Sequence, residues 1–172
     1  MLDIDHTLVY TCSVSIPVFD RFVVGVGIGV EENAFCHVRP NAPQLLRYLV
    51  QRVIRGEVDF GFWSTGTRDY VVQIVNKLFE IADIPNDIDK VHFLFSREVT
   101  PYTGSGDFVK VLDMLNHKEC LLVDDNTLHA TIPSNYGKIL IVPPFRGVPD
   151  TVIVTLMYTM DYRFGWMPLA HV

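Results

Sequence analysis

The chain has 172 residues, of which 49% are hydrophobic, and a formal net charge of −6 at pH 7. This length suits one compact domain over residues 1–172 with a substantial core. The acidic balance disfavours nucleic acid as a partner, because a broad electrostatic contact with phosphates needs excess positive charge.

Two apolar stretches, residues 14–30 and 139–160, contain charged residues or prolines. Neither supplies the roughly 20 continuous apolar residues of a membrane span, so we expect no membrane partner. Asp3 and Asp5 stand where a signal peptide would need basic and then apolar residues, so we expect no signal peptide. Three cysteines without close spacing favour free thiols in a reducing intracellular compartment, the nucleus or the cytoplasm: Cys12, Cys36 and Cys120.

The chain opens with two carboxylates two residues apart, in Asp3-Ile4-Asp5-His6-Thr7. This spacing fits a strand end that runs into a tight loop, because alternate side chains leave a strand on the same side. In that arrangement Asp3 could attack phosphorus. Asp5 could give a proton to the leaving alcohol and then take one from the attacking water. The alternative is a surface loop without a catalytic role, and the residues further along the chain decide between the two.

A β-branched and Gly-rich stretch follows and predicts a small β-hairpin insertion over about residues 13–38. Its strands are expected at 23–30 and 34–38 around a turn at 31–33. Helical stripes and short apolar strands then alternate, with helices expected around 45–54, 71–79, 108–115 and 152–160, and strands at 58–63, 91–95, 121–123 and 139–142. This alternation predicts an α/β fold, a Rossmann-like and mostly parallel sheet with helices on both faces. Ligands of such sheets lie beyond the carboxyl ends of the strands.

Further polar groups fall at the ends of predicted strands. Ser64 and Thr65 precede a helix start, where a hydroxyl and backbone N–H groups can hold a phosphoryl oxygen, or the hydroxyl can simply cap the helix. Lys110 is expected just inside a helix, where it could neutralise phosphate or be a solvated charge. Asp124 and Asp125 end an apolar strand, and their oxygens suit magnesium unless the turn is merely solvated.

The order of carboxylate pair, hydroxyl, lysine and acid pair resembles the haloacid dehalogenase superfamily of aspartate-based phosphatases. Within it, the chain resembles the phosphatases that act on the RNA polymerase II C-terminal domain, the NLI-interacting-factor-like (FCP/SCP type) family. The resemblance covers nearly the whole chain, through LDIDHTLV (2–9), VRP (38–40), WSTGTRDY (63–70), LFSRE (94–98), FVKVL (108–112) and LVDDN (122–126).

The resemblance implies a role for each matching residue. Asp3 would be the nucleophile and form an aspartyl-phosphate, and Asp5 would be the general acid and base. Ser64 would hold a phosphoryl oxygen, and Lys110 would offset negative charge. The implied magnesium ligands are Asp3, the backbone carbonyl of Asp5, and Asp125, with Asp124 close by. The implied substrate-binding residues are Thr65, Arg68, Tyr70 and Arg97.

The substrate class also follows from the resemblance. Small-molecule members of the superfamily carry a large cap domain, whereas this chain has only the 13–38 insertion, so we expect an open site. The resemblance implies a phosphoserine or phosphothreonine in an extended protein segment like the polymerase C-terminal domain. The alternatives are a pseudo-phosphatase that only binds, a nucleic-acid end phosphatase, and a small-metabolite phosphatase.

Only Met1 and Leu2 precede Asp3, whereas a central strand in this fold has about five residues. Two residues cannot fill the middle of a buried sheet without leaving neighbouring backbone groups unpaired. We therefore expect the gap to be filled by a segment of another copy of the chain, giving a homodimer, or by rearrangement near residues 1–10.

Overall fold

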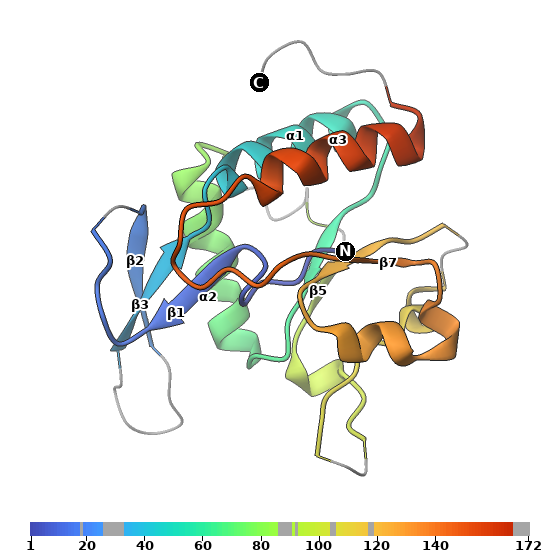
Figure 1. Ribbon diagram of the computed structural model, residues 1–172, viewed down its shortest axis with the longest axis horizontal. Coiled ribbons are helices and arrows are strands. Elements are labelled where there is room, and N and C mark those ends of the chain that lie inside the picture. Colours follow the sequence, from blue (N-terminus) through green and yellow to red (C-terminus); the bar gives the residue numbers. More distant parts are fainter. Residues whose placement is uncertain are drawn as a thin grey trace.

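A twisted parallel sheet lies at the centre of the molecule (Figure 1). The computed structural model describes residues 1–17, 19–25, 33–85, 91, 93–103, 106–116 and 119–166. Two parallel pairs of strands are present: β4 (Gly61–Trp63) with β5 (Phe93–Phe95), and β6 (Leu122–Asp124) with β7 (Ile139–Ile141). Leu2 forms parallel bridges to Phe62 and to Val123, so the start of the chain lies between β4 and β6 and joins the two pairs.

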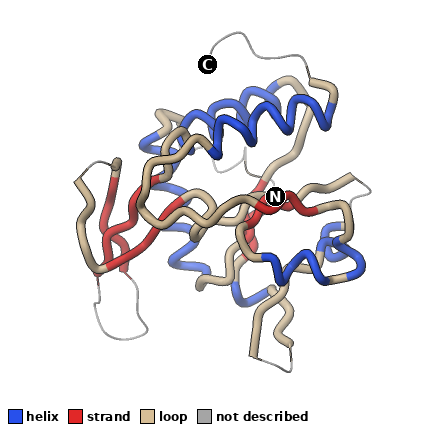
Figure 2. The backbone as a smooth tube through the Cα atoms, viewed as in Figure 1, coloured by secondary structure: helices blue, strands red, loops and turns tan. Residues whose placement is uncertain are grey.

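Helical segments cover both faces of this sheet (Figure 2). Three α-helices, α1 (Ala42–Ile54), α2 (Arg68–Ile81) and α3 (Val152–Phe164), share one buried cluster with Leu2 and Ile4. On the other face the short 3-10 helix η3 (Leu112–Leu115) packs against Trp63 and Leu122. The remaining 3-10 helices are η2 (Arg97–Val99), η4 (Thr127–Thr131) and η5 (Pro133–Asn135). The predicted α/β fold with a mostly parallel sheet is confirmed.

Beside this sheet lies a three-stranded antiparallel sheet with β3 (Asn33–Val38) in its middle, between β1 (Val9–Cys12) and β2 (Arg21–Gly25). The β2–β3 hairpin confirms the predicted insertion, with Arg21 opposite His37. The sequence did not predict β1, which pairs Val9 with Val38 and ties the opening motif to the insertion. Of the turn predicted at 31–33, residues 31 and 32 lie outside the described residues, as do residues 26–30, and Asn33 is the first residue of β3.

The helix predicted over residues 108–115 is wrong. Only residues 112–115 are helical, as η3, and Lys110 precedes this short helix. The side chain of Asn135 explains the difference, since its Oδ1 accepts a hydrogen bond from the Leu112 N–H at 2.9 Å. Its Nδ2 donates to the Lys110 carbonyl at 2.7 Å. Backbone groups that a longer helix would pair internally are therefore bonded to a side chain 25 residues away.

The other predicted helices are confirmed close to their expected limits. The first turn of α1 holds Pro43, and Gly56 follows its end with φ 68°, a conformation that favours glycine. Thr67 is the N-cap residue of α2, although its side chain makes no capping hydrogen bond. Among the helices of the described chain, none has the length and apolar character needed to cross a bilayer.

Candidate active site

Most of the polar residues that the sequence placed at strand ends line one cavity of about 620 Å³. The parallel strands explain this, because their carboxyl ends meet at one edge of the sheet. The lining includes Asp3, Asp5, Thr65, Lys110, Asp124 and Asp125, and also His6, Tyr10, Asn126, Thr127, His129, Pro144 and Arg146.

Lys110 links the carboxylates at one side of this cavity. Its ammonium donates to Asp3 Oδ1 and, at 2.7 Å, to Asp124 Oδ2. All three side chains are almost fully buried. Burial raises the pKa of Asp3 to about 7, against the opposing effect of the Lys110 charge, and burial also raises the pKa of Asp124. Burial opposes the charge of Lys110, but the carboxylates of Asp3 and Asp124 raise its pKa, so the lysine stays cationic.

His129 and Asn135 hold the Lys110 backbone in place. The Lys110 N–H points to His129 Nδ1 at 3.4 Å, and Asn135 Nδ2 donates to the carbonyls of Lys110 and His129 at 2.7 and 2.9 Å. Burial, and then the Lys110 charge, lowers the pKa of His129 to about 4. The imidazole is therefore neutral, and its Nε2 lies 3.7 Å from Asp124 Oδ2.

Asp5 faces a different set of groups, the hydroxyls of Tyr70 and Ser64. Tyr70 donates to Asp5 Oδ1 at 2.5 Å, and Ser64 Oγ lies 3.4 Å from Asp5 Oδ2. The Tyr70 hydroxyl also contacts Thr11 Oγ1 at 3.1 Å. Burial raises the pKa of Asp5, while the bonds from Tyr70 and Ser64 lower it. The two acids of the opening motif thus have different surroundings, one cationic and one made of hydroxyls.

Close packing around Ser64 requires a glycine two residues later. Ser64 Oγ accepts a hydrogen bond from the Gly66 N–H at 2.9 Å. A Cβ atom at Gly66 would lie 2.6 Å from Tyr70 Cδ1, which is too close for any other residue without movement of the ring. Gly66 therefore lets Tyr70 reach Asp5.

The loop after Asp5 turns sharply at His6, whose φ is 61°. The neighbouring Arg39 is almost fully buried and fixes this loop, because its Nη1 donates to the Thr7 carbonyl at 3.0 Å. Its Nη2 donates to the Pro143 carbonyl at 2.8 Å, and it pairs with Asp150 at 2.9 Å. One arginine therefore joins the opening motif to the segment that follows β7.

Three carboxylates are close enough to hold one cation. Oxygen atoms of Asp3, Asp124 and Asp125 all lie within 4.8 Å of one another. Burial raises the pKa of Asp125, as it does for the other two, and a cation would relieve this cost. Oxygen donors are what magnesium prefers. The side chain of Asp5 is outside this group and instead bonds Tyr70.

The predicted substrate-binding residues take different positions. Thr65 lines the cavity, and its carbonyl accepts a hydrogen bond from Arg97 Nε at 2.8 Å. Arg97 is exposed, with its guanidinium 5.5 Å from the centre of the Phe108 ring. Tyr70 contacts Asp5. Arg68 is exposed at the start of α2, and it is not among the residues that line the cavity.

The sequence analysis missed Asn135, His129 and Arg39 as parts of the site. Asn135 and His129 come from η5 and η4, more than 15 residues after Lys110, so no local pattern connects them. Arg39 had a weak signal, because it stands in the VRP segment that carried the resemblance.

Comparisons with known proteins bear on the fold and on the family of this chain. A structure of the fission yeast RNA polymerase II CTD phosphatase Fcp1 bound to beryllium fluoride superposes with a TM-score of 0.57 at 12% identity. The match covers 95% of this chain and 48% of that one, so this chain spans about half its length. No curated protein matches the sequence. The family model described as NLI interacting factor-like phosphatase matches residues 1–162. The chain belongs to the NLI interacting factor-like phosphatase family.

Proposed function

We propose that this phosphatase is a magnesium-dependent protein serine/threonine phosphatase that works through an aspartyl-phosphate on Asp3. The observation that carries the proposal is the different setting of two nearby carboxylates. Asp3 lies beside the Lys110 ammonium, whereas Asp5 is bonded to the Tyr70 hydroxyl. A nucleophile needs neighbouring positive charge to stay ionised near a phosphate. A general acid needs a setting that keeps its proton, and burial provides this for Asp5 because it raises the pKa of that carboxyl.

The reaction would proceed in two steps. In the first, an Asp3 carboxylate oxygen forms a bond to phosphorus while the bond to the substrate oxygen breaks, and Asp5 gives its proton to the leaving alkoxide. In the second, Asp5 takes a proton from water, the water oxygen bonds to phosphorus, and the bond to Asp3 breaks. Phosphate leaves and Asp3 is restored. Ser64, whose Oγ lies 3.4 Å from Asp5 Oδ2, would donate to a phosphoryl oxygen.

Magnesium fits the donor set of this site. Asp3, Asp124 and Asp125 would hold it, together with the backbone carbonyl of Asp5. When bound, the ion neutralises charge on the phosphoryl group and on the crowded carboxylates. Lys110 would remain paired with Asp124 and keep the nucleophile oriented.

For the substrate we propose a phosphoserine or phosphothreonine in an extended segment, as in the RNA polymerase II C-terminal domain. The family membership and the name of the Fcp1 structure support this class. Thr65 lines the cavity and Arg97 donates a hydrogen bond to the Thr65 carbonyl, and these two residues would contact the chain on either side of the phosphate. The three cysteines are free, which suits a reducing intracellular compartment, the nucleus or the cytoplasm.

The test is a panel of phosphopeptides assayed with magnesium and with a chelator. We expect phosphate release that needs magnesium and that Asp3→Asn abolishes, while Asp5→Asn slows it by about 10²–10⁴-fold. Both changes keep side-chain shape, and circular dichroism checks that each variant is folded.

The same panel separates the alternatives. Binding of phosphopeptides without any turnover would indicate a pseudo-phosphatase. Preferential hydrolysis of a phosphorylated DNA end would indicate a nucleic-acid phosphatase. Hydrolysis of a phosphorylated metabolite with no phosphopeptide turnover would overturn the protein-substrate proposal.

A further inference from the structure

Arg146 lines the active-site cavity, and the two chemical steps give it no role. Its side chain is exposed, whereas Lys110 in the same lining is almost fully buried and bonds Asp3 and Asp124. Among the described residues, no hydrogen bond or ion pair of the Arg146 side chain is found. The guanidinium is therefore a cation at the mouth of the cavity that is available to bind an anion.

The backbone on both sides of Arg146 is held in place. The Phe145 N–H donates to the His6 carbonyl at 2.5 Å, and His6 Nδ1 lies 3.2 Å from the Phe145 carbonyl. The Phe145 ring is fully buried, and the Arg39 guanidinium lies 5.6 Å from its centre. Gly147 follows with a φ of 72°, a conformation that favours glycine. An anion at the cavity mouth would thus meet an arginine whose backbone position is already fixed.

The strand β1 shows from which side Arg146 approaches the cavity. Successive residues of a strand point to opposite faces. Thr11 points toward α2, since its Oγ1 lies 3.1 Å from the Tyr70 hydroxyl. Tyr10 points to the other face, where a Cβ atom at Gly147 would lie 3.2 Å from Tyr10 Cδ1. The segment that holds Arg146 therefore packs on the face of β1 opposite to Tyr70.

An extended substrate would cross the cavity between these two sides. Thr65 also lines the cavity, in the segment that leads into α2 and Tyr70. When the phosphate reaches Asp3, one flank of the peptide would lie near Thr65 and the other near Arg146. A cavity of about 620 Å³ is roughly 8–9 Å across, or about two to three residues of an extended chain. Arg146 would meet a side chain within that distance of the phosphorylated residue.

The charge of the cavity gives this cation a purpose. Four carboxylates are part of the lining, those of Asp3, Asp5, Asp124 and Asp125. A substrate with a second negative group beside its phosphate would be repelled by these carboxylates. A guanidinium at the mouth offsets the repulsion, and its planar fork matches the oxygens of a carboxylate or a phosphate.

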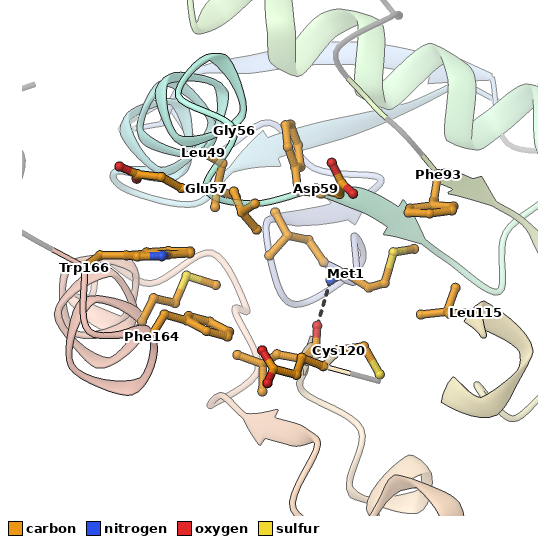
Figure 3. Close-up of a pocket in the computed structure, with 16 residues that line it drawn as sticks. Met1, Leu49, Gly56, Glu57, Asp59, Phe93, Leu115, Cys120, Phe164 and Trp166 are labelled. Carbon is orange, nitrogen blue, oxygen red and sulfur yellow. Dashed lines mark hydrogen bonds between the residues drawn. The ribbon is translucent and has the colours of Figure 1, made fainter. Parts of the chain in front are cut away.

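A second cavity, of about 310 Å³, differs in charge (Figure 3). Acidic side chains line it, without any lysine or arginine among the described residues: Glu57, Asp59 and Glu119. It also lies in line with the chain's own first strand, at Met1, whose amino group donates to the Leu121 carbonyl at 2.7 Å. It therefore offers no comparable site for an anion, and we assign it no ligand.

We propose that Arg146 determines substrate specificity by binding a second anionic group of the substrate, within about three residues of the phosphorylated serine or threonine. This group is a carboxylate or a second phosphate, because both present paired oxygens to a guanidinium. The inference rests on the proposed phosphatase function and adds a preference to it. The contact lies away from the reacting atoms, so it acts on KM more than on kcat.

The test compares phosphopeptides that differ by one side chain. The neutral reference is a phosphoserine with three alanines on each side and blocked ends. One alanine at a time is replaced by Glu, by Lys, or by a phosphonate analogue of phosphoserine that cannot be hydrolysed. At one or two neighbouring positions we expect Glu to raise kcat/KM about threefold, as for an exposed ion pair. The phosphonate has about twice the charge and should raise it about tenfold at low salt.

The two kinds of acidic peptide identify the source of the anion. A gain with Glu as well as with the phosphonate would support a preference for acidic residues. A gain confined to the phosphonate would support a preference for a second phosphate. In both cases the gain should shrink at high salt, because the contact is exposed.

Protein variants locate the preference. Arg146→Gln should reduce the ratio of kcat/KM for the Glu peptide over the neutral peptide to about one. Arg146→Glu should make the Lys peptide the better substrate. Arg55→Gln is the matched control, at an exposed position at the end of α1 outside the cavity lining, and should keep the ratio of the unaltered protein. The affinity of Asp3→Asn for the same peptides measures the preference without turnover.

Three results would overturn the proposal. The first is no position at which an acidic group raises kcat/KM or affinity. The second is an acidic preference that Arg146→Gln keeps. The third is an equal loss of p-nitrophenyl phosphate hydrolysis in Arg146→Gln, which would assign Arg146 to the phosphoryl group itself. Turnover of the neutral peptide without any acidic preference would contradict this inference alone, whereas no turnover of any phosphopeptide would contradict the phosphatase proposal.

Discussion

The hydroxyl of Tyr70 donates a hydrogen bond to Asp5 Oδ1 at 2.5 Å, so a residue of α2 holds an acid of the opening motif. Burial raises the pKa of Tyr70, and the negative charge of Asp5 raises it further, so the phenol keeps its proton and acts as the donor. The resemblance implied that Tyr70 contacts substrate. The geometry adds a second role, in which Tyr70 fixes the orientation and the pKa of Asp5.

Tyr70→Phe distinguishes these roles. Loss of a hydrogen bond to a carboxylate costs about 1.5–3 kcal/mol, which corresponds to roughly a tenfold to hundredfold fall in kcat. We expect this fall with little change in KM, measured with p-nitrophenyl phosphate, and a change in the pH profile of kcat. Tyr10→Phe, which removes another hydroxyl from a residue lining the cavity, is the control. A raised KM at unchanged kcat would instead support substrate contact alone.

Asn135→Ala should both destabilise the protein and lower its activity. The amide bonds three backbone groups, those of Lys110, Leu112 and His129, and buried groups that lose a partner cost about 1–3 kcal/mol each. We expect a loss of about 2–4 kcal/mol in urea unfolding. Asn76→Ala, at a half-buried position of α2, should change stability by less than about 1 kcal/mol. Equal effects of the two variants would contradict a special role for Asn135.

Arg39→Lys tests the junction between the opening motif and the segment after β7. A lysine cannot reproduce the bonds of the guanidinium to the carbonyls of Thr7 and Pro143 together with the pair to Asp150. A loss of about 2–4 kcal/mol in unfolding free energy is expected, because the carbonyls stay buried. Unchanged stability would show that the loop is held by its other contacts.

Magnesium binding should release protons. Burial raises the pKa of Asp3 to about 7, so below that pH its carboxyl carries a proton that must leave before the oxygen can hold a cation. The affinity for magnesium is therefore expected to rise with pH up to about 7 and to level off above it. Titration calorimetry in buffers of different ionisation enthalpy measures the protons released. An affinity independent of pH, with no proton release, would contradict this assignment.

Local sequence patterns predicted those parts of the fold that depend on neighbouring residues. The apolar stripes of α1, α2 and α3 placed three helices, because the period of 3.6 residues is visible wherever one face is buried. The same reasoning failed at residues 108–115, where Asn135 takes the backbone groups of Lys110 and Leu112. An apolar stripe indicates which side chains are buried, but it does not indicate which partners the backbone N–H and C=O groups of those residues bond.

The sequence by itself determined the chemistry available to this protein, because the spacing of Asp3 and Asp5, the hydroxyl of Ser64, Lys110 and the acid pair at Asp124 and Asp125 are fixed in the chain. Only the tertiary structure decided how these groups pair, since Lys110 bonds Asp3 and Asp124 while Tyr70 bonds Asp5. It also joined Leu2 in a parallel ladder to Phe62 on one side and to Val123 on the other. Contacts between residues 60 to 120 positions apart depend on the packing of the whole sheet, and no local pattern encodes them.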